Sequence, residues 1–89
     1  MSAIETREEI ERWVLGVCRE IGLRAEGADD DFFESGGNSL AAMRIIAQAE
    51  DTFGEDTLPP DDLFARSSVR EIADSILRNR RLAAASNES

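Results

Sequence analysis

Apolar residues recur in the first quarter of the chain with the spacing of one face of an α-helix. The repeat consists of Ile10, Trp13, Val14, Val17, Cys18 and Ile21. Thr6 and Glu9 stand at the spacing of a capping box, in which each side chain bonds the backbone of the other. Gly22 is a residue on which helices commonly end. The pattern therefore predicts a helix over Thr6–Ile21 that buries one face along its length.

A second apolar repeat predicts a helix that begins at Asn38 or Ser39 and ends near Phe53, where a glycine follows. The face predicted to pack into the core consists of Ala42, Ile45, Ile46, Ala49 and Phe53. Another stripe, turned away from the first, consists of Leu40, Met43 and Ala47. A small helical core does not need both stripes. The second stripe is either covered by Phe32 or Phe33 of the preceding loop, or exposed as an apolar docking patch. We favour the exposed patch.

The rest of the chain predicts a loop, one short helical turn and a last helix. Residues 22–38 lack helical periodicity and contain four glycines, so we expect a long ordered loop there. Residues 61–64 suit a short helical turn after two prolines. Ser68 and Glu71 form a second capping-box motif, which begins a helix whose apolar face consists of Val69, Ile72, Ala73, Ile76 and Leu77. The fold class is therefore all-α: a small bundle of three to four helices with a long loop between helices 1 and 2.

The chain of 89 residues is long enough for one small domain. We expect a flexible N-terminus over 1–5, the folded domain over 6–78, and a partly disordered tail over 79–89. The initiator methionine and the lack of linker-like segments suggest a free-standing protein. A single cysteine and no secretory signal indicate a cytoplasmic setting, and no apolar run is long enough to span a membrane.

The charge of the chain excludes several classes of function. It has 19 acidic and 10 basic residues, a net charge of −9, and no His. Without His it cannot form a Ser-His-Asp triad or an imidazole metal site. The acidic excess lies between Glu26 and Asp62, where eleven acids accompany Arg44 alone. Such a surface repels nucleic acid and anionic lipid, so we expect neither as a partner and favour a basic protein instead. We expect the protein to be a monomer.

Three consecutive Asp residues, 29–31, invite comparison with calcium-binding loops. A loop starting at Asp29 would need an oxygen ligand where Phe33 stands and a Glu where Leu40 stands. We therefore expect no metal site. Cys18 lies on the apolar face of the first predicted helix, where a buried structural thiol is the simplest interpretation.

The segment Gly36-Gly37-Asn38-Ser39-Leu40 lies where the long loop enters the second predicted helix. Paired glycines permit backbone angles and close approach that other residues resist. At a helix start, Ser39 lies beside unpaired backbone N–H groups and the positive end of the helix dipole, where a phosphate ester is stabilised. In an arbitrary helix, however, an Asn or Ser at this place only caps the helix.

A longer string, from Asp31-Phe32-Phe33 through Gly36-Gly37-Asn38-Ser39-Leu40, closely resembles the carrier-protein family. These are the peptidyl carrier and acyl carrier domains of nonribosomal peptide and polyketide assembly lines. Other dipeptides resemble the third-helix region of the family: Leu58-Pro59, Leu63-Phe64 and Ser68-Val69. The resemblance covers the chain from the first helix to about Leu77, and the paired glycines favour the peptidyl branch.

This resemblance implies that Ser39 carries 4′-phosphopantetheine, transferred from coenzyme A by a phosphopantetheinyl transferase, with support from Gly36, Gly37 and Asn38. The thiol of the arm would hold an aminoacyl or acyl group as a thioester, and the chain itself would not be an enzyme. Its partners would be an adenylation or other loading enzyme and downstream condensation, tailoring or thioesterase-type enzymes. The residues expected to dock them are Leu40, Met43, Ala47, Asp61 and Asp62.

Two alternatives stay open at this stage. The first is an acyl carrier protein of polyketide or fatty-acid type, with the same attachment residue but different cargo. The second belongs to another class: an acidic helical protein-interaction module in which Ser39 is not modified. It explains the charge and the helices but not the Asp-Phe-Phe and Gly-Gly-Asn-Ser-Leu motifs.

Overall fold

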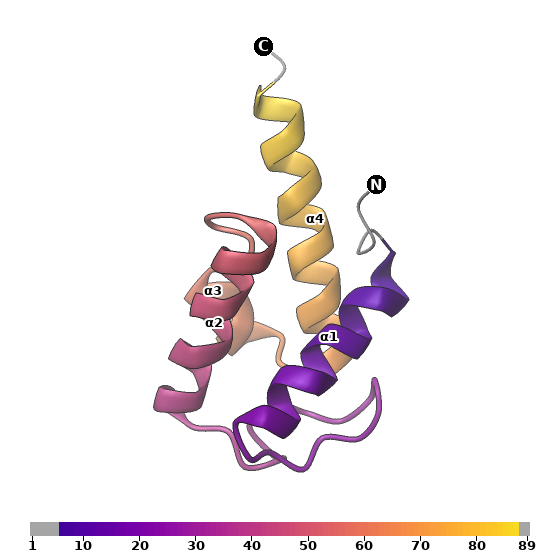
Figure 1. The fold of residues 1–89 in the computed structure, drawn as a ribbon, viewed down its shortest axis with the longest axis vertical. Helices are drawn as coiled ribbons and strands as arrows, with labels where there is room; N and C mark the ends of the chain where they lie inside the picture. The colour runs from indigo at the N-terminus through magenta and orange to yellow at the C-terminus, as the bar shows by residue number, and fades with distance from the viewer. Residues whose placement is uncertain (1–5, 88–89) are drawn as a thin grey trace.

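The computed structural model of the protein describes residues 6–87, with side chains through Leu82. This part of the chain forms four helices, shown in Figure 1: α1 (Arg7–Glu20), α2 (Ser39–Phe53), α3 (Pro60–Ala65) and α4 (Val69–Asn87). Within the described residues, the only β-type pairing is an isolated antiparallel bridge between Asp31 and Ser68. The predicted all-α bundle with a long loop between its first two helices is confirmed.

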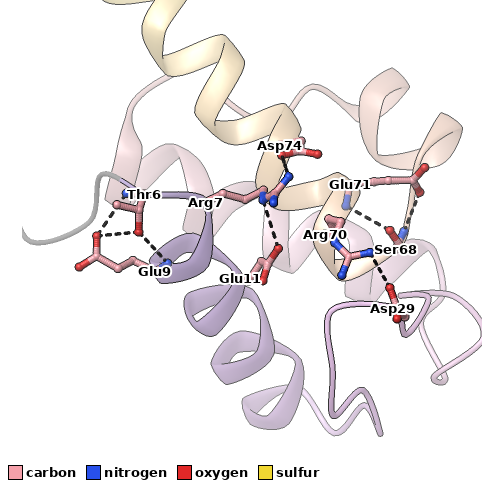
Figure 2. Close-up of polar contacts among 9 residues, drawn as sticks. All are labelled: Thr6, Arg7, Glu9, Glu11, Asp29, Ser68, Arg70, Glu71 and Asp74. Atoms are coloured by element: carbon pink, nitrogen blue, oxygen red, sulfur yellow. Dashed lines mark hydrogen bonds and ion pairs between the residues drawn. The ribbon is translucent and has the colours of Figure 1, made fainter.

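Both predicted capping boxes are present. In the first, the N–H of Glu9 donates to Thr6 Oγ1 and the N–H of Thr6 donates to Glu9 Oε1, each at 3.2 Å. In the second, the N–H of Glu71 donates to Ser68 Oγ at 3.1 Å and the N–H of Ser68 donates to Glu71 Oε1 at 3.2 Å. Figure 2 shows both pairs at the starts of α1 and α4. Because these contacts lie within four residues, the sequence alone locates both helix starts.

The core draws apolar side chains from all four helices and from the loop between α1 and α2. The most voluminous side chains among those fully buried are Phe32, Ile10, Ile45, Leu58, Leu63, Ile72 and Ile76. The helices with the largest mutual contact are α1 and α4. The predicted core face of α2 packs as expected: Ala42, Ile45 and Ala49 are buried, while Ile46 and Phe53 are partly buried against the core.

One end of the bundle is closed by an aromatic cluster. The rings of Trp13 and Phe53 meet edge to face, with centroids 4.9 Å apart, which joins α1 to the end of α2. The guanidinium of Arg80 lies over the Phe53 ring at 5.7 Å from its centroid, within the range of a cation–π interaction. Beside this cluster, Asn79 donates from Nδ2 to the carbonyl of Thr57 at 3.2 Å. The packed part of α4 thus includes Asn79 and Arg80, just past the predicted domain limit.

The last helix is longer than its apolar repeat predicts. Its apolar face ends at Leu77, but α4 continues to Asn87 through most of the predicted tail. In Figure 1 its C-terminal half extends past the ends of the other helices. The predicted flexible N-terminus, residues 1–5, and tail residues 88–89 lie outside the described residues. No helix in the described part of the chain is both long and apolar enough to cross a membrane.

Candidate functional site

The start of α2 settles which of two neighbouring residues caps the helix. Asn38 is the cap: its backbone is extended, and its Oδ1 accepts the N–H of Ala41 at 2.9 Å. Ser39 is therefore the first residue of the helix proper. Its side chain is exposed and has no hydrogen-bond partner among the described residues. The Ser39 hydroxyl is thus available for chemistry, because the helix start is satisfied without it.

The electrostatic setting of Ser39 suits a negative charge. The first turn of α2 contains no acidic residue. The first backbone N–H groups of a helix have no partners within it, and the helix dipole places partial positive charge at the same end. A phosphodiester on Ser39 Oγ would meet this positive end without a neighbouring carboxylate. The residues present therefore fit a covalently attached phosphopantetheine arm.

Glycine is needed at the two positions 36 and 37 for different structural reasons. Gly36 has φ +114°, a backbone conformation that residues with side chains rarely adopt. Gly37 is required by close packing. A Cβ built on it would lie 2.6 Å from the carbonyl oxygen of Phe32 and 2.7 Å from the Phe32 ring. The N–H of Gly37 also donates to that same carbonyl at 3.0 Å. The paired glycines therefore let the chain fold tightly over Phe32 just before α2 begins.

Phe32 and Phe33 fix the loop between α1 and α2 in different ways. Phe32 is completely buried in the core, whereas Phe33 is half-buried. The Phe33 ring stacks on Phe64 of α3, with centroids 5.3 Å apart and an interplanar angle of 12°. These contacts agree with the long ordered loop that the sequence predicts over residues 22–38.

Asp31 links this loop to the turn between α3 and α4. Its carboxylate accepts the N–H of Phe33 at 2.9 Å, the N–H of Glu34 at 3.0 Å and the hydroxyl of Ser67 at 2.6 Å. Burial alone would raise the pKa of Asp31, but these three donors together lower the pKa below its ordinary value. Beside it, the N–H of Phe32 donates to the carbonyl of Ser67 at 2.7 Å. Sequence reasoning missed this connection.

The other two residues of the Asp run also have partners within the protein. Asp30 Oδ2 accepts the N–H groups of Glu26 and Gly27, at 2.7 and 3.1 Å. Asp29 pairs with Arg70 of α4 at 2.6 Å, as Figure 2 shows. Within the described residues, no group of three or more acidic, His or Cys side chains could hold a metal ion. The bonds of the three Asp side chains shape the loop and attach it to α4 and to the turn before it.

Comparison with known proteins identifies the family of the chain. Residues 3–76 match the phosphopantetheine attachment site family. The chain belongs to this family. Members of this family are non-catalytic carrier domains with a covalently attached 4′-phosphopantetheine. This chain is a carrier domain of that family, and it spans only a small part of the length of the curated relatives that it matches.

Three proteins illustrate the similarity of this carrier domain to curated sequences. It is 44% identical over 73 residues to the isonitrile lipopeptide synthase of Mycobacterium tuberculosis, covering 81% of this chain and 3% of that protein. It is 38% identical over 74 residues to phosphinothricin tripeptide synthetase PhsC of Streptomyces viridochromogenes, covering 82% and 7%. It is 39% identical over 72 residues to syringomycin synthase SyrB1 of Pseudomonas syringae pv. syringae, covering 80% and 12%. No solved structure matches the chain.

The stripe predicted to dock partners of the carrier domain is on its surface. Leu40 is 61% exposed, Met43 is 67% exposed, and Ala47 is also exposed. The alternative interpretation, that Phe32 or Phe33 covers this stripe, is wrong because those rings pack into the core and against α3. The fold therefore leaves an apolar strip along α2 that begins beside Ser39. Its docking role stays a prediction.

The two acidic residues predicted to dock partners differ in their surroundings. Asp61 is exposed and has no side-chain bond among the described residues. Asp62 accepts from Asn79 Nδ2 at 2.9 Å and lies 3.5 Å from a guanidinium nitrogen of Arg78. Asp62 therefore already holds α3 against α4, which leaves Asp61 as the better placed of the two to meet a partner.

The single thiol of the carrier domain is not placed for chemistry. Cys18 is buried and free, and burial raises its pKa to about 11. A thiol with a pKa that high is protonated at neutral pH and is a poor nucleophile. The prediction of a structural thiol in the core of α1 agrees with this environment.

Proposed function

We propose that Ser39 is the residue that carries 4′-phosphopantetheine, and that the domain is a peptidyl carrier of nonribosomal peptide or hybrid peptide–polyketide synthesis. The observation that carries this proposal is the state of the Ser39 hydroxyl. It is exposed on the first residue of α2, it has no bond within the described residues, and Asn38 does the capping in its place. The Gly-Gly-Asn-Ser-Leu motif and the names of the similar synthetases support the peptidyl branch.

In the proposed modification, Ser39 Oγ attacks the phosphorus atom of coenzyme A that bears the pantetheine arm. A new phosphorus–oxygen bond forms at Ser39, the phosphorus–oxygen bond of the pyrophosphate bridge breaks, and adenosine 3′,5′-bisphosphate leaves. The first turn of α2 contains no acidic residue beside Ser39, so the proposal assigns the hydroxyl proton to a base of the transferase. The N-terminal end of α2 stabilises the resulting negative charge on the phosphodiester. When bound, the arm supplies a terminal thiol that carries an aminoacyl or acyl group as a thioester.

The surface around Ser39 supports docking of several enzymes in turn. Leu40, Met43 and Ala47 offer an exposed apolar strip, and Asp61 adds an exposed charge. Methionine suits such a strip because its flexible, polarizable side chain adapts to different partner surfaces. The proposed partners are a phosphopantetheinyl transferase, an adenylation or other loading enzyme, and condensation, tailoring or thioesterase-type enzymes. A cytoplasmic location is consistent with the free thiol of Cys18.

Intact-mass measurement after incubation with coenzyme A and a broad-specificity transferase tests this proposal. The natural chain should gain the mass of one phosphopantetheinyl group, and Ser39→Ala should gain none. Because Asn38 is the cap, Ser39→Ala should change the free energy of unfolding by no more than about 0.5 kcal/mol.

Ser35→Ala is the matched control, because Ser35 is the nearest other serine in the same loop. This variant should be modified like the natural chain. Modification of the Ser39→Ala variant would contradict the assignment of Ser39. Failure of the natural chain to gain mass with an active transferase would instead favour the unmodified interaction module.

A further inference from the structure

A groove on α4 differs in charge from the rest of the domain. It has a volume of about 490 Å³ and is lined by Arg66, Asp74, Leu77, Arg78, Arg81 and Leu82. Three of its six residues are arginines and one is acidic, while the whole chain carries a net charge of −9. A basic surface on so acidic a domain is therefore a local feature that the average composition does not explain.

Two of the three groove arginines form no side-chain hydrogen bond or ion pair among the described residues. Arg78 lies 3.5 Å from Asp62, and Asp74 lies 3.5 Å from Arg7, as Figure 2 shows for the second pair. The guanidinium groups of Arg66 and Arg81 have no hydrogen bond or ion pair among the described residues. Because Arg7 already compensates Asp74, the groove keeps an excess of positive charge.

The groove also has an apolar component that the core does not need. Leu77 is half-buried against the core, whereas Leu82 is 59% exposed. Single exposed leucines are common on protein surfaces. Here, however, Leu82 shares the groove with Arg66 and Arg81, so cationic and apolar groups face the same occupant. A simple inorganic anion would use only the arginines.

None of the residues that line the groove belongs to α2, where Ser39 and the Leu40–Met43–Ala47 strip lie. In Figure 1, α2 begins at the lower end of the bundle, while the C-terminal half of α4, which contains Arg81 and Leu82, extends toward the upper end. An occupant that lies along this half of α4 would therefore leave Ser39 and the strip uncovered. A protein bound there could stay in place while other enzymes visit the arm.

We propose that this groove is a second docking surface, which binds an acidic amphipathic helix of a partner protein. Carboxylates of that helix would pair with Arg66 and Arg81, and an apolar side chain would pack against Leu77 and Leu82. A polynucleotide or an anionic membrane fits less well, because its extended negative charge would meet the eleven acids between Glu26 and Asp62. The small size of the groove indicates a weak, rapidly exchanging contact.

The test uses the full chain and a fluorescein-labelled peptide of about 15 residues, with Leu and Glu on one helical face. Fluorescence anisotropy measures the affinity, and backbone amide chemical shifts locate the bound peptide. We expect shifts at the residues that line the groove, which are Arg66 and the stretch of α4 from Asp74 to Leu82. Reversing both unpaired charges, in Arg66→Glu/Arg81→Glu, should weaken binding by about tenfold.

The matched control is Arg12→Glu/Arg24→Glu, which changes the net charge equally at two exposed arginines outside the groove. It should weaken binding much less. The milder Arg66→Gln/Arg81→Gln variant should give an intermediate affinity, and it keeps the test valid if the charge-reversed variant does not fold. Circular dichroism checks the fold of each variant.

Several outcomes would overturn the proposal. These are no binding by the natural chain, shifts located elsewhere, or equal losses in the groove variant and the control. Tighter, arginine-dependent binding of anionic vesicles or of a single-stranded oligonucleotide would reassign the groove to that ligand. Modification of Ser39 should proceed at the natural rate in the groove variants. A slower rate would show that the groove belongs to the transferase contact and is not a separate surface. The peptide-binding measurements, by contrast, do not depend on whether Ser39 is the attachment residue.

Discussion

The residues just before α2 and the first residues of α2 are adjacent in sequence but differ in almost every contact. Phe32 is fully buried, Gly37 is packed against it, and Asp31 accepts three hydrogen bonds. Ser39 and Met43, a few residues later, are exposed and lack side-chain hydrogen bonds or ion pairs among the described residues. The difference shows how a small domain can expose a hydroxyl group: the contacts are concentrated in the segment that positions the helix, and the outward-facing side chains at the helix start make no such contacts.

The largest effect on stability is expected at Phe32. Phe32→Ala removes a fully buried ring and should lower the free energy of unfolding by about 3–5 kcal/mol. Phe64→Ala is the control, because Phe64 is 55% exposed and its stacking on Phe33 is worth only about 1 kcal/mol. Denaturant unfolding measures both. Equal losses would show that the buried anchor and the surface aromatic residue do not differ as described.

The next effect is expected at Gly37. Gly37→Ala places a methyl group against the backbone and ring of Phe32, so neighbouring atoms must shift. Such overpacking should cost about 1–3 kcal/mol in the free energy of unfolding. Gly27→Ala provides the contrast, because a Cβ there meets nothing within 4 Å, and should change stability by no more than about 0.5 kcal/mol. If Gly37→Ala leaves the free energy of unfolding unchanged, close packing against Phe32 does not explain the glycine at position 37.

A smaller, pH-dependent effect is expected at Asp31. Because folding lowers the pKa of Asp31, its ionised form stabilises the fold above the pKa of the unfolded chain. This stabilisation is lost as the pH falls through the folded-state pKa. Asp31→Asn should therefore lower stability by about 1 kcal/mol at neutral pH, and the difference from the natural chain should close in acid. Melting temperatures of both proteins across an acidic pH series measure this, and a difference independent of pH would contradict it.

The smallest stability effect, together with an effect on function, is expected at Met43. Because this side chain is 67% exposed, Met43→Ala should change the free energy of unfolding by no more than about 0.5 kcal/mol. It should nevertheless slow modification or loading by at least one partner enzyme. Thr52→Ala, at an exposed position near the other end of α2, is the kinetic control. A large loss of stability with unchanged kinetics would show that Met43 packs into the fold like Phe32 and does not contact partner enzymes.

Local patterns predicted most of this fold because they act within a few residues. The Thr6–Glu9 box, the apolar repeats and the approximate bounds of α1 and α2 agree with the structure for this reason. The choice between Asn38 and Ser39 as the cap stayed open, because both residue types serve that role equally well.

Contacts between distant segments were not predictable in the same way. Asp31 and Ser67 are 36 residues apart, and no local signal joins them. An Asp side chain in a turn commonly accepts the N–H groups two and three residues further along the chain. The presence of Asp31 could therefore have suggested its bonds to Phe33 and Glu34. The reason for Gly37 was also hidden, because its neighbour Phe32 approaches it only once the loop has folded back.

The capping of α2 by Asn38 has a thermodynamic consequence for the life cycle of the domain. Since Asn38 Oδ1 accepts the N–H of Ala41, a substituent on the Ser39 oxygen displaces no bond that the fold depends on. The modified form should therefore be at least as stable as the unmodified one, because the phosphodiester adds a favourable interaction with the N-terminal end of α2. If Ser39 is the attachment residue as proposed, newly made domain is already fully folded before a transferase modifies it. Loss of the arm by hydrolysis would then return the domain to that same folded state, ready for another modification.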